Sequence, residues 1–184
     1  WRDWLDSQPW TTLFVDGNHE NFDLLDDYPV SYWHGGKVHF IKDSVIHLMR
    51  GQIYTIDGQT FFTFGGGYSC DIETRVEHRS WWQQELPTTK EWNEALNNLL
   101  QYNFHVDYII THDCPFYIKE LLHTRTIPCN LDDYTLSHLR NIDEVIDDIE
   151  QLVTYKLWFS GHLHIDQTIY KHVILFNTIY CLER

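Results

Sequence analysis

Residues 106–112, Val-Asp-Tyr-Ile-Ile-Thr-His, decide the fold class of this chain. The run from Val106 to Ile110 is apolar except for Asp107, which is typical of a short strand covered on both faces, and it ends at a histidine. Hydrophobic residues at helical spacing predict one helix before this strand, over Thr89–Tyr102, and another after it, over about Asp133–Val153. Strands that alternate with helices in this way predict an α/β protein.

Hairpins accompany this alternation. The pair Asp57-Gly58 separates two β-rich runs and predicts a type I′ turn, which needs positive φ at both central residues. We interpret His34-Gly35-Gly36 as a further turn, and residues 169–176 as a hairpin-like pair. The sequence therefore predicts a layered α/β fold with mixed sheets, in a single domain over residues 1–184.

Composition narrows the class of protein. A formal net charge of −14 argues against a surface that coats nucleic acid, because phosphate backbones require Lys and Arg. No apolar run approaches the roughly 20 residues of a membrane-spanning helix. The four cysteines form no CxxC motif, so we expect reduced thiols in a cytoplasmic protein; they are Cys70, Cys114, Cys129 and Cys181.

Three short polar motifs each follow an apolar run. Because ligands in α/β sheets bind beyond the strand ends, we expect their side chains to meet at one edge. Imidazole nitrogen and amide oxygen are metal ligands, so the set predicts a metal site. The motifs are Gly17-Asn18-His19-Glu20, Thr111-His112-Asp113-Cys114-Pro115 and Gly161-His162-Leu163-His164.

Within the last motif, alternate residues of an extended segment project to the same side, so both imidazoles are expected to face one site. Gly161 is expected to let the backbone approach closely. Each motif alone has an ordinary explanation, since Asn18 is a common turn former and His112 could be a satisfied core residue. Their joint order is the functional signal.

In this order the three motifs resemble the later motifs of the calcineurin-like metallophosphoesterase superfamily, which are GNH[DE], a strand-end His and GHxH. The resemblance covers nearly the whole chain and implies a two-layered β-sandwich flanked by helices. Residues 65–71, Arg75 and residues 80–85 resemble small bacterial and phage members. Gly67 and Gln83 depart from the Ala and Pro that are typical there.

The resemblance implies a ligand set. Asn18, His112 and His162 would bind one metal ion, and His164 would bind a second. The two divalent ions expected in the complete protein would be Mn²⁺, Fe or Zn²⁺.

The resemblance also implies roles in catalysis and substrate binding. His19 would be catalytic, stabilising the phosphoryl oxygens or protonating the leaving group, and Glu20 could orient it. Asp71 and Arg75 would shape the substrate pocket, although an ion pair within their own loop explains them equally well.

The family's two earlier motifs, DxH and GDxxD, do not occur, since no His has an Asp two residues before it and no Gly precedes Asp. These motifs supply the carboxylate that bridges the two metals. The chain starts at Trp1 and its one methionine is Met49, so we expect that it begins after those motifs and lacks their strands. We then expect one firmly bound ion or none and little hydrolysis. Open apolar strand edges would favour a homo-oligomer.

The expected function is that of a metal-dependent phosphoesterase. This hydrolase would cleave a phosphate mono- or diester of a small molecule or nucleotide, by a two-metal mechanism in the full-length protein. The alternative is a degenerate, non-catalytic member that acts as a binding or scaffold module. Protein Ser/Thr phosphatases also carry GNHE and His-Gly-Gly, but His34-Gly35-Gly36 follows GNHE too closely here. A nuclease is disfavoured by the lack of a basic, aromatic patch.

Overall fold

The computed structural model describes residues 1–124 and 139–182. Cys129, Leu136, His138 and the predicted helix start at Asp133 lie outside the described residues. The described α-helices are α1 (Arg2–Asp6), α2 (Phe22–Asp26), α3 (Thr89–Gln101), α4 (Phe116–Leu121) and α6 (Ile142–Leu152), with single 3₁₀ turns at Ile72–Thr74 and Gln83–Glu85. In these ranges no helix has the length and apolar character needed to cross a membrane.

The N-terminal sheet has the strand order β1-β4-β3-β2. Strand β1 pairs with β4 in parallel, and the other pairs are antiparallel. The predicted turn at His34-Gly35 is confirmed, since φ is 48° and 101° at these residues, which join β2 to β3. The bounds are β1 (Thr12–Phe14), β2 (Val30–Trp33), β3 (Gly36–Lys42) and β4 (Val45–Leu48).

The C-terminal sheet has the order β5-β6-β7-β8-β10-β9 and four parallel strands at its centre. The predicted type I′ hairpin between β5 and β6 is confirmed, with φ of 51° at Asp57 and 78° at Gly58. The predicted pair near residues 169–176 is also antiparallel. The bounds are β5 (Gln52–Ile56), β6 (Gln59–Phe64), β7 (Tyr108–Thr111), β8 (Leu157–Ser160), β9 (Gln167–Ile169) and β10 (His172–Ile174).

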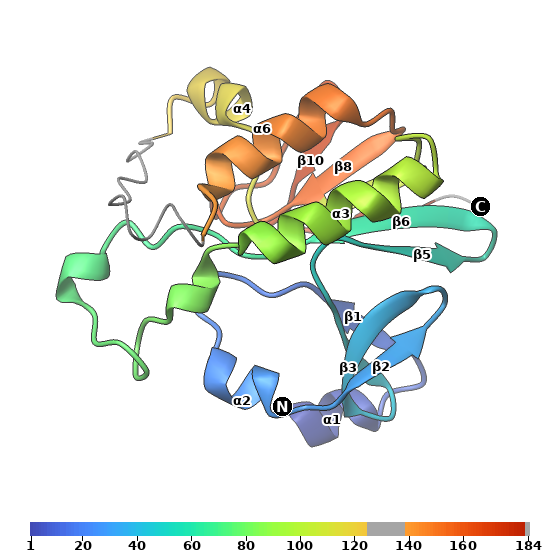
Figure 1. Ribbon diagram of the computed structural model, residues 1–184, viewed down its shortest axis with the longest axis vertical. Helices are drawn as coiled ribbons and strands as arrows, with labels where there is room; N and C mark the ends of the chain where they lie inside the picture. Colours follow the sequence, from blue (N-terminus) through green and yellow to red (C-terminus); the bar gives the residue numbers. More distant parts are fainter. Residues whose placement is uncertain (125–138, 183–184) are drawn as a thin grey trace.

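Helices α3 and α6 lie side by side across one face of the C-terminal sheet (Figure 1). The main core lies beneath them and includes Phe62, Ile109, Ile146 and Trp158, all of them at most 1% exposed. The prediction of a mixed α/β fold is confirmed: two mixed sheets are flanked by helices.

Helix starts follow local capping. Thr88 and Glu91 form a reciprocal capping box, which fixes the start of α3 where the sequence predicted it. Helix α6 begins at Ile142, because the Asn141 side chain accepts the Asp143 N–H. Leu139 instead bridges to Thr88. The prediction that residues 139–141 are helical was therefore wrong.

Candidate functional site

The three motifs meet at the carboxyl ends of their strands. Asn18 follows β1, His112 follows β7 and His162 follows β8. The Nε2 atom of His112 lies 3.0 Å from Asn18 Oδ1 and 3.1 Å from His162 Nδ1. The structure thus brings together the three side chains predicted to share one ion.

These separations fit a metal ion. Ligand atoms about 2.1 Å from a common ion lie about 3.0 Å apart in octahedral and about 3.4 Å apart in tetrahedral geometry. Burial lowers the pKa of His112 to about 4 and also lowers that of His162, so both rings are neutral near pH 7. Neutral imidazoles can bind a metal without losing a competing proton.

The donor set is two imidazoles and one amide. Across residues 1–124 and 139–182, no group of three or more His, Cys, Asp or Glu side chains is arranged to hold a metal ion. The set at the strand ends contains two such side chains, His112 and His162, and its third member is the amide of Asn18.

Ser69 fixes the orientation of the Asn18 amide. The Asn18 Nδ2 donates to Ser69 Oγ at 3.1 Å, and the Ser69 hydroxyl donates back to the Asn18 carbonyl at 3.4 Å. Both residues are buried. The amide oxygen therefore faces His112. Sequence reasoning did not single out Ser69, which lies within the resembling stretch 65–71.

Gly17 and Gly67 lie close against the His112 ring. A Cβ at Gly17 would lie 2.9 Å from His112 Cε1, and one at Gly67 would lie 3.0 Å from His112 Cδ2 and 3.3 Å from Asn18 Cβ. Gly67, which departs from the family's typical Ala, thus stands where a methyl group would crowd two of the predicted ligands.

The Gly161–His164 segment is not extended. His162 and His164 have φ of 60° and 54°, and the Leu163 N–H donates to the Gly161 carbonyl at 2.7 Å. This is a three-residue turn of the rarer, strained kind centred on His162. The prediction of an extended segment was wrong. Gly161 has room for a Cβ, whose nearest neighbours would be 3.8 Å away, so close backbone approach does not require it.

His164 takes a separate position. Its ring stacks on Phe176, with centroids 4.9 Å apart and planes at 22°. It lines the same pocket as the other ligands. Its assignment to a second metal ion stays a prediction.

His19 faces two N–H donors. Its Nε2 lies 3.4 Å from Asn18 Nδ2 and 3.5 Å from Arg75 Nη2, so this nitrogen is an acceptor and the ring proton is on Nδ1. Burial and then the Arg75 charge lower the pKa of His19. Glu20 accepts from the Gly17 N–H at 3.3 Å, and no hydrogen bond joins it to His19 in the described part of the chain.

Asp71 and Arg75 form an ion pair within their loop. Arg75 Nε and Nη2 donate to the two Asp71 oxygens at 2.6 and 2.7 Å, and this hydrogen bonding holds the pKa of Asp71 below its ordinary value. Asp71 lines a pocket of about 320 Å³, whereas Arg75 reaches it through His19. The other lining residues are Gly17, Asn18, His19, Glu20, Tyr68, Cys70, His112, His162 and His164.

Sequence reasoning also missed the buried partners of Asp16, the residue before Gly17. Arg50 Nε donates to Asp16 Oδ2 at 2.9 Å, and His47 Nε2 lies 3.1 Å from Oδ1. Burial would raise the pKa of Asp16, but the Arg50 charge and the His47 hydrogen bond outweigh it and hold the pKa well below its usual range. The Asp16 carboxylate is therefore paired with Arg50 and His47 and does not line the strand-end pocket.

Comparison with known proteins found no match for this chain among family models, curated proteins or solved structures.

Proposed function

We propose that this chain carries the metal-binding part of a metal-dependent phosphoesterase site. One observation carries the proposal. Asn18, His112 and His162 follow three different strands, and Asn18 Oδ1 and His162 Nδ1 lie 3.0 and 3.1 Å from His112 Nε2. The His19 side chain and the Asp71–Arg75 pair stand around the same pocket, as the family resemblance implies.

The residues have distinct tasks in this proposal. Asn18, His112 and His162 would hold one ion, with Mn²⁺, Fe²⁺ and Zn²⁺ as the candidates that suit imidazole and amide donors. A divalent ion there supplies Lewis-acid polarisation of a phosphoryl oxygen. His19 Nε2 accepts hydrogen bonds in the free protein; an incoming phosphate would raise the pKa of His19, because a nearby negative charge favours the imidazolium. Arg75 steadies His19 and adds positive charge beside it.

The charge balance favours one ion over two. The donor set is neutral, and two nearby carboxylates are already matched with cations: Asp16 with Arg50, and Asp113 with Lys119. Of the described pocket residues, only Glu20 and Asp71 bring carboxylates to the walls. This observation supports a second candidate function, a module that binds one metal ion and a phosphorylated ligand without turnover.

Metal content and turnover separate the candidates. The protein would be loaded with Mn²⁺, desalted and assayed for bound metal, and for hydrolysis of p-nitrophenyl phosphate and bis(p-nitrophenyl) phosphate. The phosphoesterase predicts turnover that is lost in His19→Ala, while His112→Gln loses metal as well; His78→Gln, a loop histidine paired with Asp23, is the control. Bound metal without turnover favours the binding module. Absence of metal at millimolar Mn²⁺, Fe²⁺ and Zn²⁺ rejects both.

A further inference from the structure

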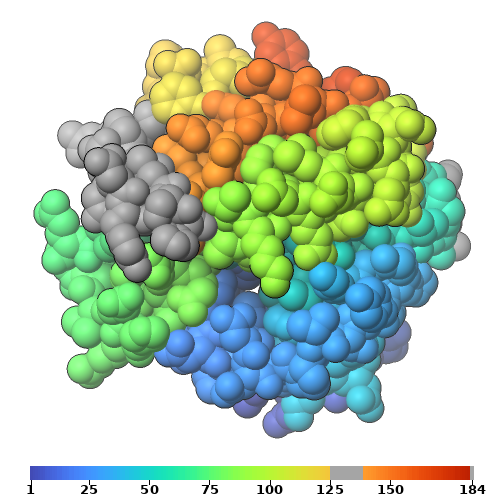
Figure 2. Space-filling view, in the orientation of Figure 1, coloured from blue at the N-terminus to red at the C-terminus, as the bar shows by residue number. Residues whose placement is uncertain are grey.

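A second cavity lies between the N-terminal sheet, α2 and α3. Its volume is about 420 Å³, and it opens to solvent beside α3, where Figure 2 shows the surface hollowed between this helix and the N-terminal sheet. The walls carry four carboxylates and three basic groups: Asp16, Asp26, Glu91 and Glu94 against Lys37, Arg50 and Lys90. The lining is therefore slightly acidic and tolerates an added cation.

Two histidines face each other on its wall. His39 on β3 and His47 on β4 are directly opposed in the antiparallel register. Their Nδ1 atoms are 3.2 Å apart, and both side chains are almost fully buried. Cross-strand neighbours of this kind place two imidazoles on the same face of the sheet.

Asp16 sets the tautomer of His47. A carboxylate paired with Arg50 only accepts hydrogen bonds, so His47 Nε2, 3.1 Å from Asp16 Oδ1, carries the ring hydrogen. The other ring nitrogen of His47, Nδ1, lies 3.2 Å from His39 Nδ1 and is then the atom that can bind a metal ion. A carboxylate that holds the far nitrogen of an imidazole is the usual outer support of a metal-ligating histidine.

We propose that His39 and His47 bind a zinc-type transition-metal ion through their Nδ1 atoms, with Asp16 as the residue that orients His47. The 3.2 Å separation lies between the spacings of neighbouring ligands in octahedral and tetrahedral sites, about 3.0 and 3.4 Å. Water from the cavity fills the remaining coordination positions.

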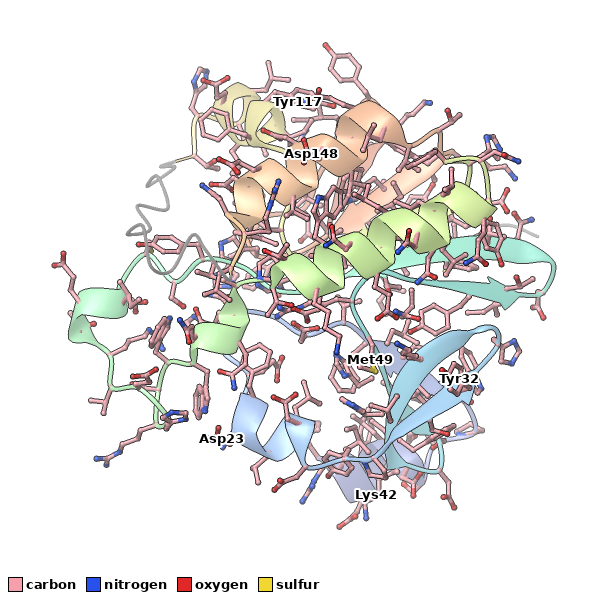
Figure 3. All side chains as sticks on the ribbon, in the orientation of Figure 1. Asp23, Tyr32, Lys42, Met49, Tyr117 and Asp148 are labelled. Atoms are coloured by element: carbon pink, nitrogen blue, oxygen red, sulfur yellow. The ribbon has the colours of Figure 1, made fainter. Side chains whose placement is uncertain are left out.

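Met49 brings a thioether to the same cavity. It follows β4, two residues after His47, and lines the cavity. Figure 3 shows its sulfur between α3 and the N-terminal sheet. A thioether in the same cavity as two imidazoles favours a borderline or soft ion over Mg²⁺ or Ca²⁺.

This site is separate from the strand-end donors, and its test does not depend on phosphoesterase activity. The double variant His112→Gln/His162→Gln removes the first site and leaves the His pair intact. Titration of this variant with Co²⁺ and Zn²⁺ should show one bound ion, which a further His39→Gln change removes or weakens at least tenfold. His78→Gln in the same background should leave the binding unchanged.

Nitrogen-15 spectra of the histidine rings give a second readout. Zn²⁺ added to the double variant should shift two Nδ1 signals while the Nε2 of His47 keeps its hydrogen. The competing arrangement, a His39 Nδ1–H donated to His47 Nδ1, predicts no bound ion and spectra that do not respond to Zn²⁺. Binding that survives His39→Gln, or spectra without Nδ1 shifts, would overturn the proposal.

Discussion

The His112 imidazole packs against Gly17 so closely that a Cβ added at position 17 would lie 2.9 Å from His112 Cε1 and 3.1 Å from Nδ1. The ring cannot yield freely, because Gly67 closes its other side and Nε2 is shared between Asn18 and His162. The glycine of the GNHE motif therefore positions a ligand that comes from a strand about a hundred residues later in the chain.

Gly17→Ala should weaken metal binding at the strand ends by about ten- to a hundredfold, as is usual when a group that supports a metal ligand is changed. The added methyl group displaces the His112 ring from Asn18 and His162. The measurement is a Mn²⁺ or Zn²⁺ titration by calorimetry.

The matched control is Gly161→Ala, which also changes a glycine at a strand end but places its Cβ 3.8 Å from the nearest atoms. It should bind metal like the unchanged chain. Equal affinities for the two alanine variants would show that the close contact at Gly17 does not position His112.

Ser69→Ala should also weaken metal binding, by about tenfold, because Asn18 Nδ2 loses its partner and the amide is free to rotate its oxygen away from His112. Ser80→Ala is the control in the same loop region, since Ser80 Oγ accepts from the Val76 N–H and touches none of the donors. Affinity is again the measurement, and an unchanged value for Ser69→Ala would mean that the amide is held without its help.

Much of the strand framework could be predicted because it depends on local chemistry. Asp57-Gly58 adopts the positive φ values of a type I′ turn, and the apolar run before His112 forms a central parallel strand. The meeting of His112 and His162 followed from the shared edge of two neighbouring parallel strands, β7 and β8. Such inferences need no knowledge of side-chain packing. Asn18 follows β1 of the N-terminal sheet, so its approach to His112 depends on how the two sheets pack.

Most of the failures concern contacts that leave no recognisable pattern in the sequence. The turn at His162 is closed by a local hydrogen bond, and the neighbouring Gly161 is tied to the His112 carbonyl; neither contact appears as a pattern in the sequence. The pairing of His39 with His47 depends on the irregular register between Phe40 and Lys42, since a shift by one residue would turn His39 to the other face. Capping by Asn141 could have been found, because Asn is a strong N-cap residue.

Arg50→Met should destabilise the fold by about 3–5 kcal/mol, because it leaves the buried Asp16 carboxylate without its cation. Lys42→Met, which breaks the exposed pair with Asp3, should leave the stability nearly unchanged. Urea unfolding at pH 7 measures both free energies. If the two variants lost similar stability, the buried Asp16–Arg50 pair would contribute no more to folding than the exposed pair does.

Acid should destabilise the metal-free protein through His112. Burial lowers its pKa to about 4, against about 6.5 in the unfolded chain, so between these values the unfolded state binds the extra proton. The contribution of His112 to stability is therefore fully present above pH 6.5 and is lost as the pH falls toward 4, by up to about 3 kcal/mol. In His112→Gln the contribution disappears, which urea unfolding at several pH values would detect as a difference between the two curves that grows on acidification.

Glu85 should have the opposite effect on the pH dependence of stability. Both oxygens of its buried carboxyl group lack a hydrogen-bond partner among the described residues, and burial raises its pKa to about 7 although the Arg75 charge opposes this. Between about pH 4.5 and 7 the folded state binds the extra proton, so stability falls as the pH rises through this range, by up to about 3 kcal/mol. Between pH 4.5 and 6.5 the opposite effects of Glu85 and His112 on the free energy of unfolding then nearly cancel. Glu85→Gln keeps the shape of the side chain but does not titrate, so its stability should rise steadily with pH over that range. Parallel curves for Glu85→Gln and the unchanged chain would mean that Glu85 ionises equally in the folded and unfolded states.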